Sequence, residues 1–396
     1  MMRVWVGVDA GKEHHWAAVL DENGQTLLSR RFLNDEQAIV QLVNDIDDIG
    51  EQVTWAMDMS TGYVALLLAV LWHRGKSVNY VSGRAMNRAS DGYRSEGKTD
   101  AKDARIIADQ ARLRRDFASL TPQADLLTDL SILVTHRRDL ATDRQRMVVR
   151  LRERLASVFP ALERALDVTT KGALVLLTRW QTPDAIRNAG ESVIAAHLRG
   201  TAGIRVHKLT QAAMTAAQTQ TVSLPGEQTT AAIVARLARE LLRLRDEINQ
   251  LDADLEQRFR SHAQADVLTS LPGMGTLLAA EFLVAVGDIA NFTDADHLAA
   301  YAGLAPVPRD SGRRSGNLQR PHRYNRALMR VFYTSAMVAA GRPGPSRDYY
   351  QRKRTEGKRH IQAVMALARR RVNVMWAMLR DAQPYTEQLP KTAPQT

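Results

Sequence analysis

The N-terminal part of the chain switches between strand-like and helix-like spacing of its apolar residues, and this order limits the possible folds more than any other feature. Arg3 to Asp9 alternate between apolar and polar residues as a strand does, and His15 to Leu20 repeat the pattern. The turn Asp21 to Gly24 then leads into a third alternating run, Gln25 to Phe32. These segments predict a three-stranded antiparallel meander.

Helical and strand segments alternate after this meander. Asp35 to Ile46 and Tyr63 to Arg74 have helical spacing, whereas Val53 to Met57 and Ser77 to Val81 are short strand-like runs. Three strands followed by α, β, α and β elements and one more helix predict a mixed sheet with helices on its faces, as in the ribonuclease-H fold. We expect such an α/β domain over residues 1–115.

Beyond about residue 115 the strand signals stop and the spacing becomes heptad-like. Two sets of apolar residues show it: Leu126, Leu130, Leu133, Leu140, Met147, Leu151 and Val158, and then Leu237, Leu241, Leu244, Ile248, Leu251 and Leu255. Each set predicts a long helix, and we expect the two to pair as an antiparallel coiled coil with a smaller helical insert between them, over residues 116–265. Two ordinary amphipathic helices in one bundle are the alternative.

A third, mainly helical domain is expected over residues 266–384, followed by a disordered tail, 385–396. The run from Leu271 to Gly275 opens an apolar helix and resembles a helix-hairpin-helix turn. In such a turn, the amides of Gly273 and Gly275 and the helix N-terminus that follows can hold a DNA phosphate. An ordinary helix-turn-helix corner explains the same residues equally well.

The charge balance indicates the class of partner. Lys and Arg total 54 against 43 Asp and Glu, giving a net charge of +11 and a pI near 10.0, which suits nucleic acid. The longest apolar runs are well short of the ~20 residues of a membrane-spanning helix, and Asp9 interrupts the apolar stretch near the N-terminus. There are no cysteines for disulfides or thiolate metal sites. We therefore expect a cytoplasmic protein with no membrane partner.

Four aspartates are candidates for metal ligands. Asp9 ends the first strand, Asp58 follows the strand Val53 to Met57, and Asp100 and Asp103 lie three apart near the start of a helix, where they share a face. Hard Mg²⁺ prefers oxygen ligands, and Mn²⁺ is an alternative. Two such ions ~4 Å apart can activate an attacking oxygen and stabilise a leaving one in phosphodiester chemistry.

Each aspartate also has a structural explanation. Asp58 or Asp100 could cap the helix that follows it, Asp103 could be a first-turn acid favoured by the helix dipole, and Asp9 could be a turn residue. Capping preferences alone do not readily explain why an acid follows each of two strands and why two more acids lie at i and i+3 on a helix. The joint pattern therefore favours the metal site.

A basic segment, Pro308 to Gly316, which we call the serine loop, places Ser311 and Ser315 among arginines. The guanidinium groups of Arg309, Arg313 and Arg314 can bind phosphate oxygens and stabilise charge on a phosphorane. A serine held there could attack a phosphodiester and conserve its energy as a phosphoserine. From these residues alone, a solvated turn that only touches the phosphate backbone is the more usual explanation.

A second basic cluster follows the serine loop. Arg320, His322, Arg323 and Tyr324 superficially resemble the residues of tyrosine recombinases. Four such residues packed together usually bind the nucleic-acid backbone, so Tyr324 is not expected to be the nucleophile.

At these residues the chain resembles the DEDD insertion-sequence transposases of the one-ten family, whose N-terminal domain is similar to the Holliday-junction resolvase RuvC. The resemblance covers nearly the whole chain and is carried by these segments: Val6 to Asp9, Ala56 to Tyr63, Lys98 to Ala104, Leu271 to Gly275, Phe292 to Gly303, and Gly303 to Pro306 running into Ser311-Gly312. The family's second acid is usually Glu, whereas this chain has the shorter Asp58. A closer backbone, a bridging water or a weakened catalyst would each accommodate that difference.

The resemblance implies a DNA recombinase that mobilises its own element, with Ser311 as nucleophile and Ser315 as the second candidate. No His or Lys base is evident nearby, so Mg²⁺ held by the four aspartates would lower the pKa of the hydroxyl. The resemblance further implies double-stranded donor and target DNA, a structured guide RNA, and a homo-oligomer, dimer or tetramer, in which one protomer's carboxylates complete another's serine site. It also implies association with a bacterial nucleoid.

Two other functions compete with this interpretation. A junction-resolving nuclease would use the carboxylates alone, attack with water, and leave Ser311 dispensable for cutting. A non-catalytic nucleic-acid-binding protein would lose nothing when the acids are removed.

Overall fold

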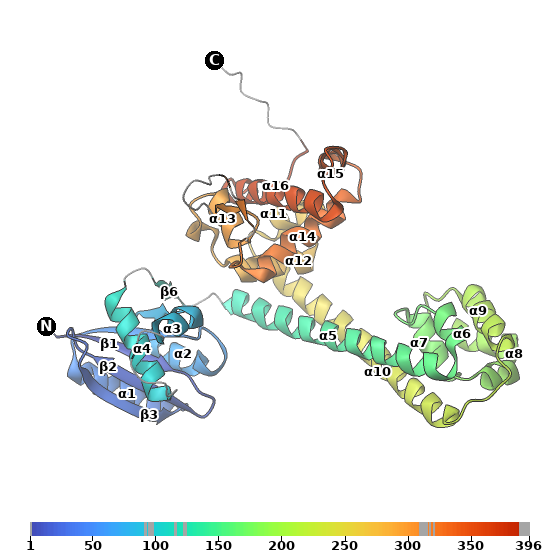
Figure 1. The fold of residues 1–396 in the computed structure, drawn as a ribbon, viewed down its shortest axis with the longest axis horizontal. Helices are drawn as coiled ribbons and strands as arrows, with labels where there is room; N and C mark the ends of the chain where they lie inside the picture. The colour runs from blue at the N-terminus through green and yellow to red at the C-terminus, as the bar shows by residue number, and fades with distance from the viewer. Residues whose placement is uncertain are drawn as a thin grey trace, which may run out of the picture. The chain divides into compact units, whose positions relative to one another are not determined.

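The computed structural model describes residues 2–90, 93, 99–114, 117–121, 125–308, 316, 318–319 and 321–387. The chain divides into two compact units, residues 1–123 and 124–396 (Figure 1). Among the described helices, none combines the length and hydropathy needed to cross a bilayer.

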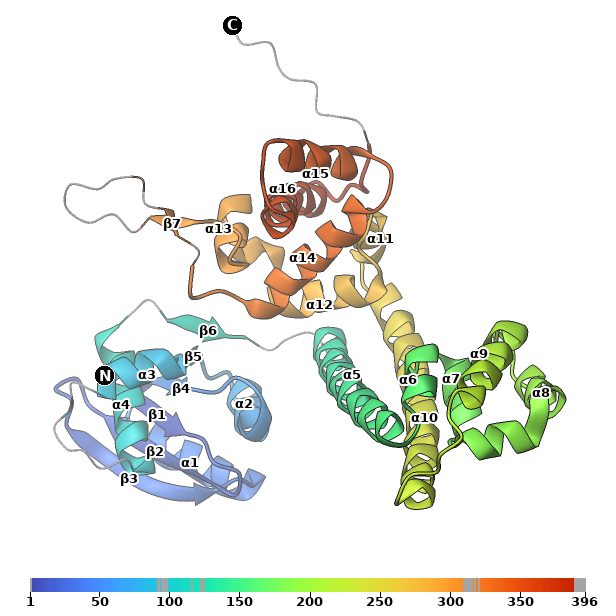
Figure 2. The same cartoon turned by 45° about the vertical axis from the view of Figure 1, so that its right-hand side comes forward.

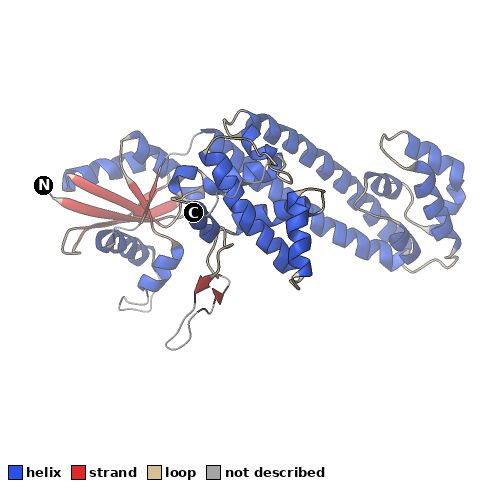
Figure 3. Ribbon diagram, turned by 90° about the horizontal axis from the view of Figure 1, so that it is seen from above, coloured by secondary structure: helices blue, strands red, loops and turns tan. Residues whose placement is uncertain are grey.

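The first unit is a six-stranded mixed sheet covered by helices (Figure 3). Its elements are β1 (Arg3–Asp9), β2 (His14–Leu20), β3 (Thr26–Leu33), α1 (Glu36–Ile49), β4 (Gln52–Met57), the 3-10 turn η1 (Gly62–Val64), α2 (Ala65–His73), β5 (Val78–Tyr80), α3 (Gly83–Ser90), α4 (Asp100–Leu113) and β6 (Ala118–Leu120). The strand order is β3-β2-β1-β4-β5-β6, with β1, β4 and β5 parallel to one another. The predicted mixed sheet with helices, beginning with an antiparallel meander, is confirmed.

The expectation that strands stop near residue 115 was wrong. β6 pairs antiparallel with β5, with Val78 opposite Leu120, and two further strands of two residues each lie near the C-terminus. A strand of three residues is too short to show an alternating pattern, so its pairing depends on β5 rather than on its own sequence.

Side-chain alternation assigns each face of the sheet to different helices. Val4, Val6 and Val8 of β1 point to one face, where they join the buried residues of α1 and α2 in one core. On the other face α4 lies directly on β1 at Gly7. A Cβ atom there would be 2.1 Å from the carbonyl oxygen of Ala104 and 2.3 Å from the amide nitrogen of Ala108, so only glycine permits this contact.

The second unit is almost entirely helical and contains two long helices, α5 (Asp125–Val158) and α10 (Glu227–Arg260). They run antiparallel and side by side, as the ion pairs Arg137–Asp252 and Arg258–Asp129 between them show (Figure 2). The two predicted long helices and their antiparallel pairing are confirmed, whereas supercoiling as a coiled coil stays a prediction.

Two groups of shorter helices pack on this pair around separate cores. The predicted insert consists of α6 (Pro160–Ala165), α7 (Lys171–Leu177), α8 (Pro183–Arg199) and α9 (Val206–Gln218). The C-terminal group consists of α11 (Ala265–Ser270), α12 (Thr276–Val286), the 3-10 turn η2 (Ile289–Asn291), α13 (Ala295–Tyr301), α14 (Arg326–Ala340), α15 (Pro345–Thr355) and α16 (His360–Arg380), with the two-residue strands β7 (Val307–Pro308) and β8 (Leu318–Gln319). The proposed domain boundaries at 115, 265 and 384 stay predictions.

Candidate functional site

Asp9 and Asp58 leave the sheet side by side. Strands β1 and β4 are parallel neighbours in a register that sets Val8 opposite Met57. Asp9 is the last residue of β1 and Asp58 immediately follows β4, so both emerge at the carboxyl edge of the same pair of strands. That edge of parallel strands is where α/β proteins commonly place their ligands.

Helix α4 brings Asp100 and Asp103 to the same edge. Near its C-terminal end, Arg112 donates a 3.1 Å hydrogen bond from Nη1 to the carbonyl oxygen of Glu22, in the turn between β2 and β3. Because Leu20 pairs with Trp5, that turn lies at the edge opposite Asp9. The N-terminal end of α4, with Asp100 and Asp103, therefore lies at the edge of Asp9 and Asp58. We call these four aspartates the acid edge.

The structure excludes the capping explanation for two of the four acids. Thr99 is the N-cap of α4, and its hydroxyl accepts a 3.2 Å hydrogen bond from the backbone amide of Lys102, so Asp100 is the first helical residue rather than the cap. Asp58 does not cap η1 or α2 either, since these begin after Thr61 and Val64. Asp103 does lie in the first turn of α4, where the helix dipole favours an acid.

The donor chemistry of the acid edge fits a hard divalent cation. Asp9, Asp58 and Asp103 are partly buried and Asp100 is exposed, so carboxylate oxygens are present both within and at the rim of this edge. In the part of the chain that the structure describes, no three His, Cys, Asp or Glu side chains are gathered closely enough to hold a metal ion. The strand register and the direction of α4 therefore set the four acids along one edge of the sheet, and their side chains would have to turn toward a bound ion.

The catalytic candidates of the serine loop lie outside the described residues. These are Ser311, Ser315, Arg309, Arg313, Arg314 and, just beyond the loop, Arg320. The residues on either side of them are described, and they pair as a short antiparallel ladder, with Val307 opposite Gln319 and Pro308 opposite Leu318. The chain between them therefore leaves and returns at one point of the C-terminal group.

The base of this ladder is anchored by a contact between Gly303 and Tyr324. Gly303 has a φ of +71°, and a Cβ atom there would lie 2.4 Å from Cγ of Tyr324. The next residue, Asn325, donates hydrogen bonds to the carbonyl oxygen of Tyr301 at 2.7 Å and to its hydroxyl at 3.0 Å. Tyr324 thus packs against the backbone of Gly303. That it is not the nucleophile stays a prediction. Arg323 beside it is exposed.

The two glycines of the turn before α12 have different surroundings. Gly273, with a φ of +82°, packs on α14, where a Cβ atom would lie 2.6 Å from the carbonyl oxygen of Ser335. Gly275 is exposed and is the N-cap residue of α12. Close packing therefore accounts for Gly273. Phosphate binding by this turn, and its helix-hairpin-helix nature, stay predictions.

Comparison with known proteins identifies the family. A family model described as Transposase matches residues 6–160, and a second, described as Transposase IS116/IS110/IS902 family, matches residues 265–351. The 44.8 kDa protein of insertion element IS116 from Streptomyces clavuligerus is 50% identical over 392 residues, which cover 98% of each chain. The chain belongs to the IS116/IS110/IS902 transposase family.

Further relatives of this transposase extend the comparison. The 42 kDa protein of insertion element IS900 from Mycobacterium paratuberculosis is 50% identical over 386 residues, which cover 96% of this chain and 97% of that one. The pilin gene-inverting protein of Moraxella bovis is 29% identical over 153 residues, 36% of this chain and 47% of that one. Transposases cut and rejoin DNA to mobilise insertion sequences, and those of the DEDD type use divalent metal ions, so DNA recombination is the activity of this family.

Two residues of α4 or its cap help to position the transposase's acid edge, although the sequence patterns above do not single them out. Thr99 caps α4, a role that a Thr just before a helical segment could have indicated. Asp109, near the other end of the same helix, pairs with Arg112 of that helix at 2.6 Å and accepts a hydrogen bond from the hydroxyl of Tyr93, which lies before α4. Burial, with Asp109 beside it, raises the pKa of Tyr93 to about 12, so this hydroxyl remains protonated near neutral pH.

Proposed function

We propose that this transposase joins DNA strands through a covalent phosphoserine formed at Ser311, with Asp9, Asp58, Asp100 and Asp103 binding divalent metal. The observation that supports the proposal is that the β1–β4 register and the direction of α4 set the backbone positions of the four acids along one edge of the sheet. The family's DNA recombination supplies the substrate class, and the acid edge supplies the ligands.

The chemistry divides between the two regions. Carboxylate oxygens of the acid edge would bind Mg²⁺, with Mn²⁺ as the alternative. Either ion, when bound, lowers the pKa of a nearby hydroxyl and stabilises negative charge on the phosphate. The Ser311 hydroxyl loses its proton and its oxygen bonds to phosphorus, while the bond to one DNA oxygen breaks and that oxygen gains a proton. A second DNA hydroxyl then attacks the phosphoserine, releases Ser311 and restores a phosphodiester. Arg309, Arg313 and Arg314 bind the phosphate oxygens throughout.

The partners proposed for this reaction are double-stranded donor and target DNA, a structured guide RNA and further copies of the chain. A net charge of +11 favours such polyanions. In a dimer or tetramer, the carboxylates of one protomer would complete the serine site of another. Sequencing the RNA that copurifies with the protein tests guidance, since enrichment for sequence beside its own gene supports it and a random sample of cellular RNA contradicts it.

The deciding experiment looks for the covalent intermediate. With DNA, guide RNA and Mg²⁺, the protein should become attached to a DNA end in a form that survives denaturing gel electrophoresis. Ser311→Ala should abolish the adduct, and Tyr324→Phe should retain it because the ring keeps its contact with Gly303. Peptide mapping that found the DNA on Ser315 would move the nucleophile by four residues. Free cut ends with no adduct in any variant would instead indicate a hydrolytic junction-resolving nuclease.

A further inference from the structure

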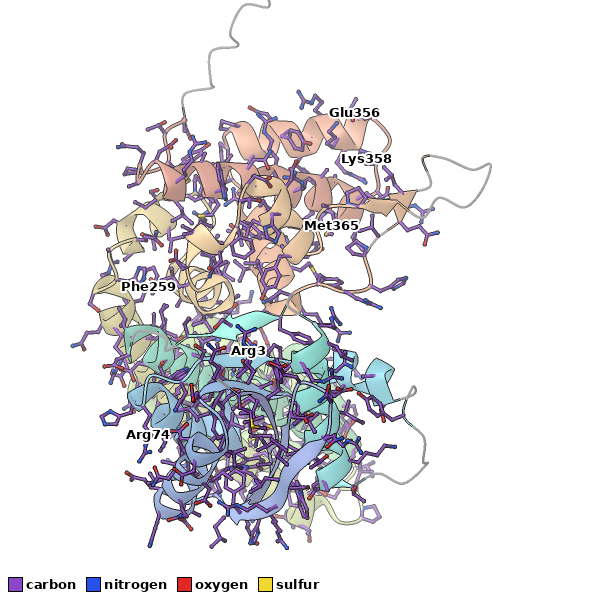
Figure 4. All side chains as sticks on the ribbon, turned by 90° about the vertical axis from the view of Figure 1, so that its left-hand side faces the viewer. Arg3, Arg74, Phe259, Glu356, Lys358 and Met365 are labelled. Atoms are coloured by element: carbon purple, nitrogen blue, oxygen red, sulfur yellow. The ribbon has the colours of Figure 1, made fainter. Side chains whose placement is uncertain are left out.

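A cavity of about 670 Å³ lies in the C-terminal helical group, away from the serine loop in sequence. Helices α15 and α16 and the segment 381–387 form its walls, with Leu271 at one side. Figure 4 marks the turn between these two helices by the labelled residues Glu356 and Lys358. Cavities of about 300–1,000 Å³ are the usual size for binding ligands larger than a single ion.

One wall of the cavity carries a buried cation, Arg371 of α16. It is 3% exposed, and it is the one charged residue of the described lining that is buried. Its Nη2 donates to the carbonyl oxygen of Pro272 and to the hydroxyl of Ser335, both at 2.6 Å, which are neutral acceptors. Its Nε is buried and has no hydrogen-bond partner among the described residues.

A buried charge without a counter-charge is destabilising, and this lowers the pKa of a basic group. Burial lowers the pKa of Arg371 to about 10, because the charged form has lost much of its hydration. An anion bound in the cavity would recover part of that lost stabilisation. The acids of the lining, Asp348, Asp381 and Glu387, are exposed, and Asp381 is paired with Arg380 at 2.6 Å.

More cations gather on α15 and α16 around the ring of Tyr349. The guanidinium carbons of Arg352 and Arg370 each lie 5.1 Å from the ring centroid, and Nζ of Lys353 lies 5.5 Å from it. Tyr349, Arg352 and Arg370 also line the cavity. The aromatic ring therefore contacts two guanidinium groups that line the same cavity as the buried Arg371.

We propose that this cavity binds one unpaired nucleotide of a DNA strand, its phosphate facing the arginines and its base against the apolar lining. A lone phosphate would leave most of the volume empty, whereas Leu367, Val374 and Met378, together with the ring of Tyr385, supply apolar and aromatic surface for a base. The inference rests on the DNA partnership of the proposed function but not on its serine chemistry.

The test compares variants of the full chain in binding a fluorescent single-stranded oligothymidylate, measured by anisotropy. Ala377 lies in the lining, so Ala377→Trp should fill the cavity without changing any charge and weaken binding by about tenfold. Arg370→Gln should weaken binding to a similar degree. Val193→Trp, on an exposed face of α8, is the matched control and should bind as the wild type does.

Arg371→Met should also weaken binding, but Arg371 holds Pro272 and Ser335, so its fold must be checked by circular dichroism. Wild-type affinity in Ala377→Trp would overturn the proposal. Any binding lost in Arg370→Gln would then reflect only the attraction of the DNA phosphates to an arginine on the surface. Preference for oligouridylate over oligothymidylate would overturn the assignment to DNA. Ser311→Ala should bind the oligomer normally, so loss of the covalent adduct and loss of this site are separate results.

Discussion

At the acid edge, four aspartates are positioned by strand register and by a helix packed on a glycine, whereas the serine loop joins a two-residue ladder anchored by one tyrosine. The first arrangement depends on contacts spread over β1, β4 and α4. The second depends on Gly303, Tyr324 and Asn325 at the ends of α13 and α14. In the proposed reaction, metal ligands need defined mutual positions, which strand register and helix packing supply, and a nucleophile needs access to the DNA phosphate. The two regions therefore correspond to the two proposed roles.

The largest expected effect comes from neutralising the acids. Asp100→Asn and Asp103→Asn should each reduce DNA exchange by on the order of 10²-fold or more, because an amide keeps the shape and loses the charge that a divalent ion needs. DNA affinity and circular dichroism should stay nearly unchanged. Recombination assays with and without a chelator check this.

The matched control for these variants is Asp48→Asn, at an exposed position of α1. It should recombine DNA at the wild-type rate. Wild-type rates in both Asp100→Asn and Asp103→Asn would show instead that these residues serve the first turn of α4 alone. Asp58→Glu, which restores the acid usual in the family, should retain activity.

A smaller effect is expected when the packing beneath the acid edge is changed. Gly7→Ala sets a methyl group against the backbone of α4, which cannot rotate away as a side chain can. We expect a loss of about 1–3 kcal/mol in the free energy of unfolding, with reduced recombination as α4 shifts. Denaturant unfolding measures the first quantity.

Gly83→Ala is the control for this change, because a Cβ atom at Gly83 meets no other atom within 4 Å. Its free energy of unfolding should stay equal or rise slightly. Equal stability of Gly7→Ala and Gly83→Ala would contradict the close contact between β1 and α4.

Sequence patterns predicted the local elements better than the contacts that bring the site together. Alternation identified β1 and β2, and the regular spacing of Leu237 and its successors identified α10. The direction of α4 depends on Gly7 meeting Ala104 and on Arg112 reaching Glu22, contacts between residues distant in sequence. Arg371 likewise has the sequence context of a surface arginine, and only packing shows that it is buried.

The anchor of the serine loop gives the next prediction. Gly303→Ala and Gly316→Ala both force alanine into the left-handed region, at φ values of +71° and +83°, at about 1–2 kcal/mol each. Only at Gly303 does the new methyl group also meet Tyr324. Gly303→Ala should therefore destabilise more, and combining it with Tyr324→Ala should recover the excess. Equal losses at both glycines would show that Tyr324 is not the anchor.

The smallest effect is a pH dependence beside the acid edge. His15 of β2 is 1% exposed, its Nδ1 accepts a 3.3 Å hydrogen bond from the amide of Gly11, and burial lowers its pKa from 6.5. The unfolded chain therefore binds a proton at a higher pH than the folded one. The contribution of neutral His15 to the free energy of unfolding is complete above pH 6.5 and is lost as pH falls through the folded pKa. One proton allows the free energy of unfolding to change by at most about 1.4 kcal/mol per pH unit.

Amide hydrogen exchange of peptides from β1 and β2, corrected for intrinsic rates, measures this effect. Protection should fall from pH 7 to pH 5, with α12, which has no histidine, as the reference. His15→Gln should flatten this dependence and His14→Gln should keep it, whereas the same pH dependence in His15→Gln would place the titrating group elsewhere.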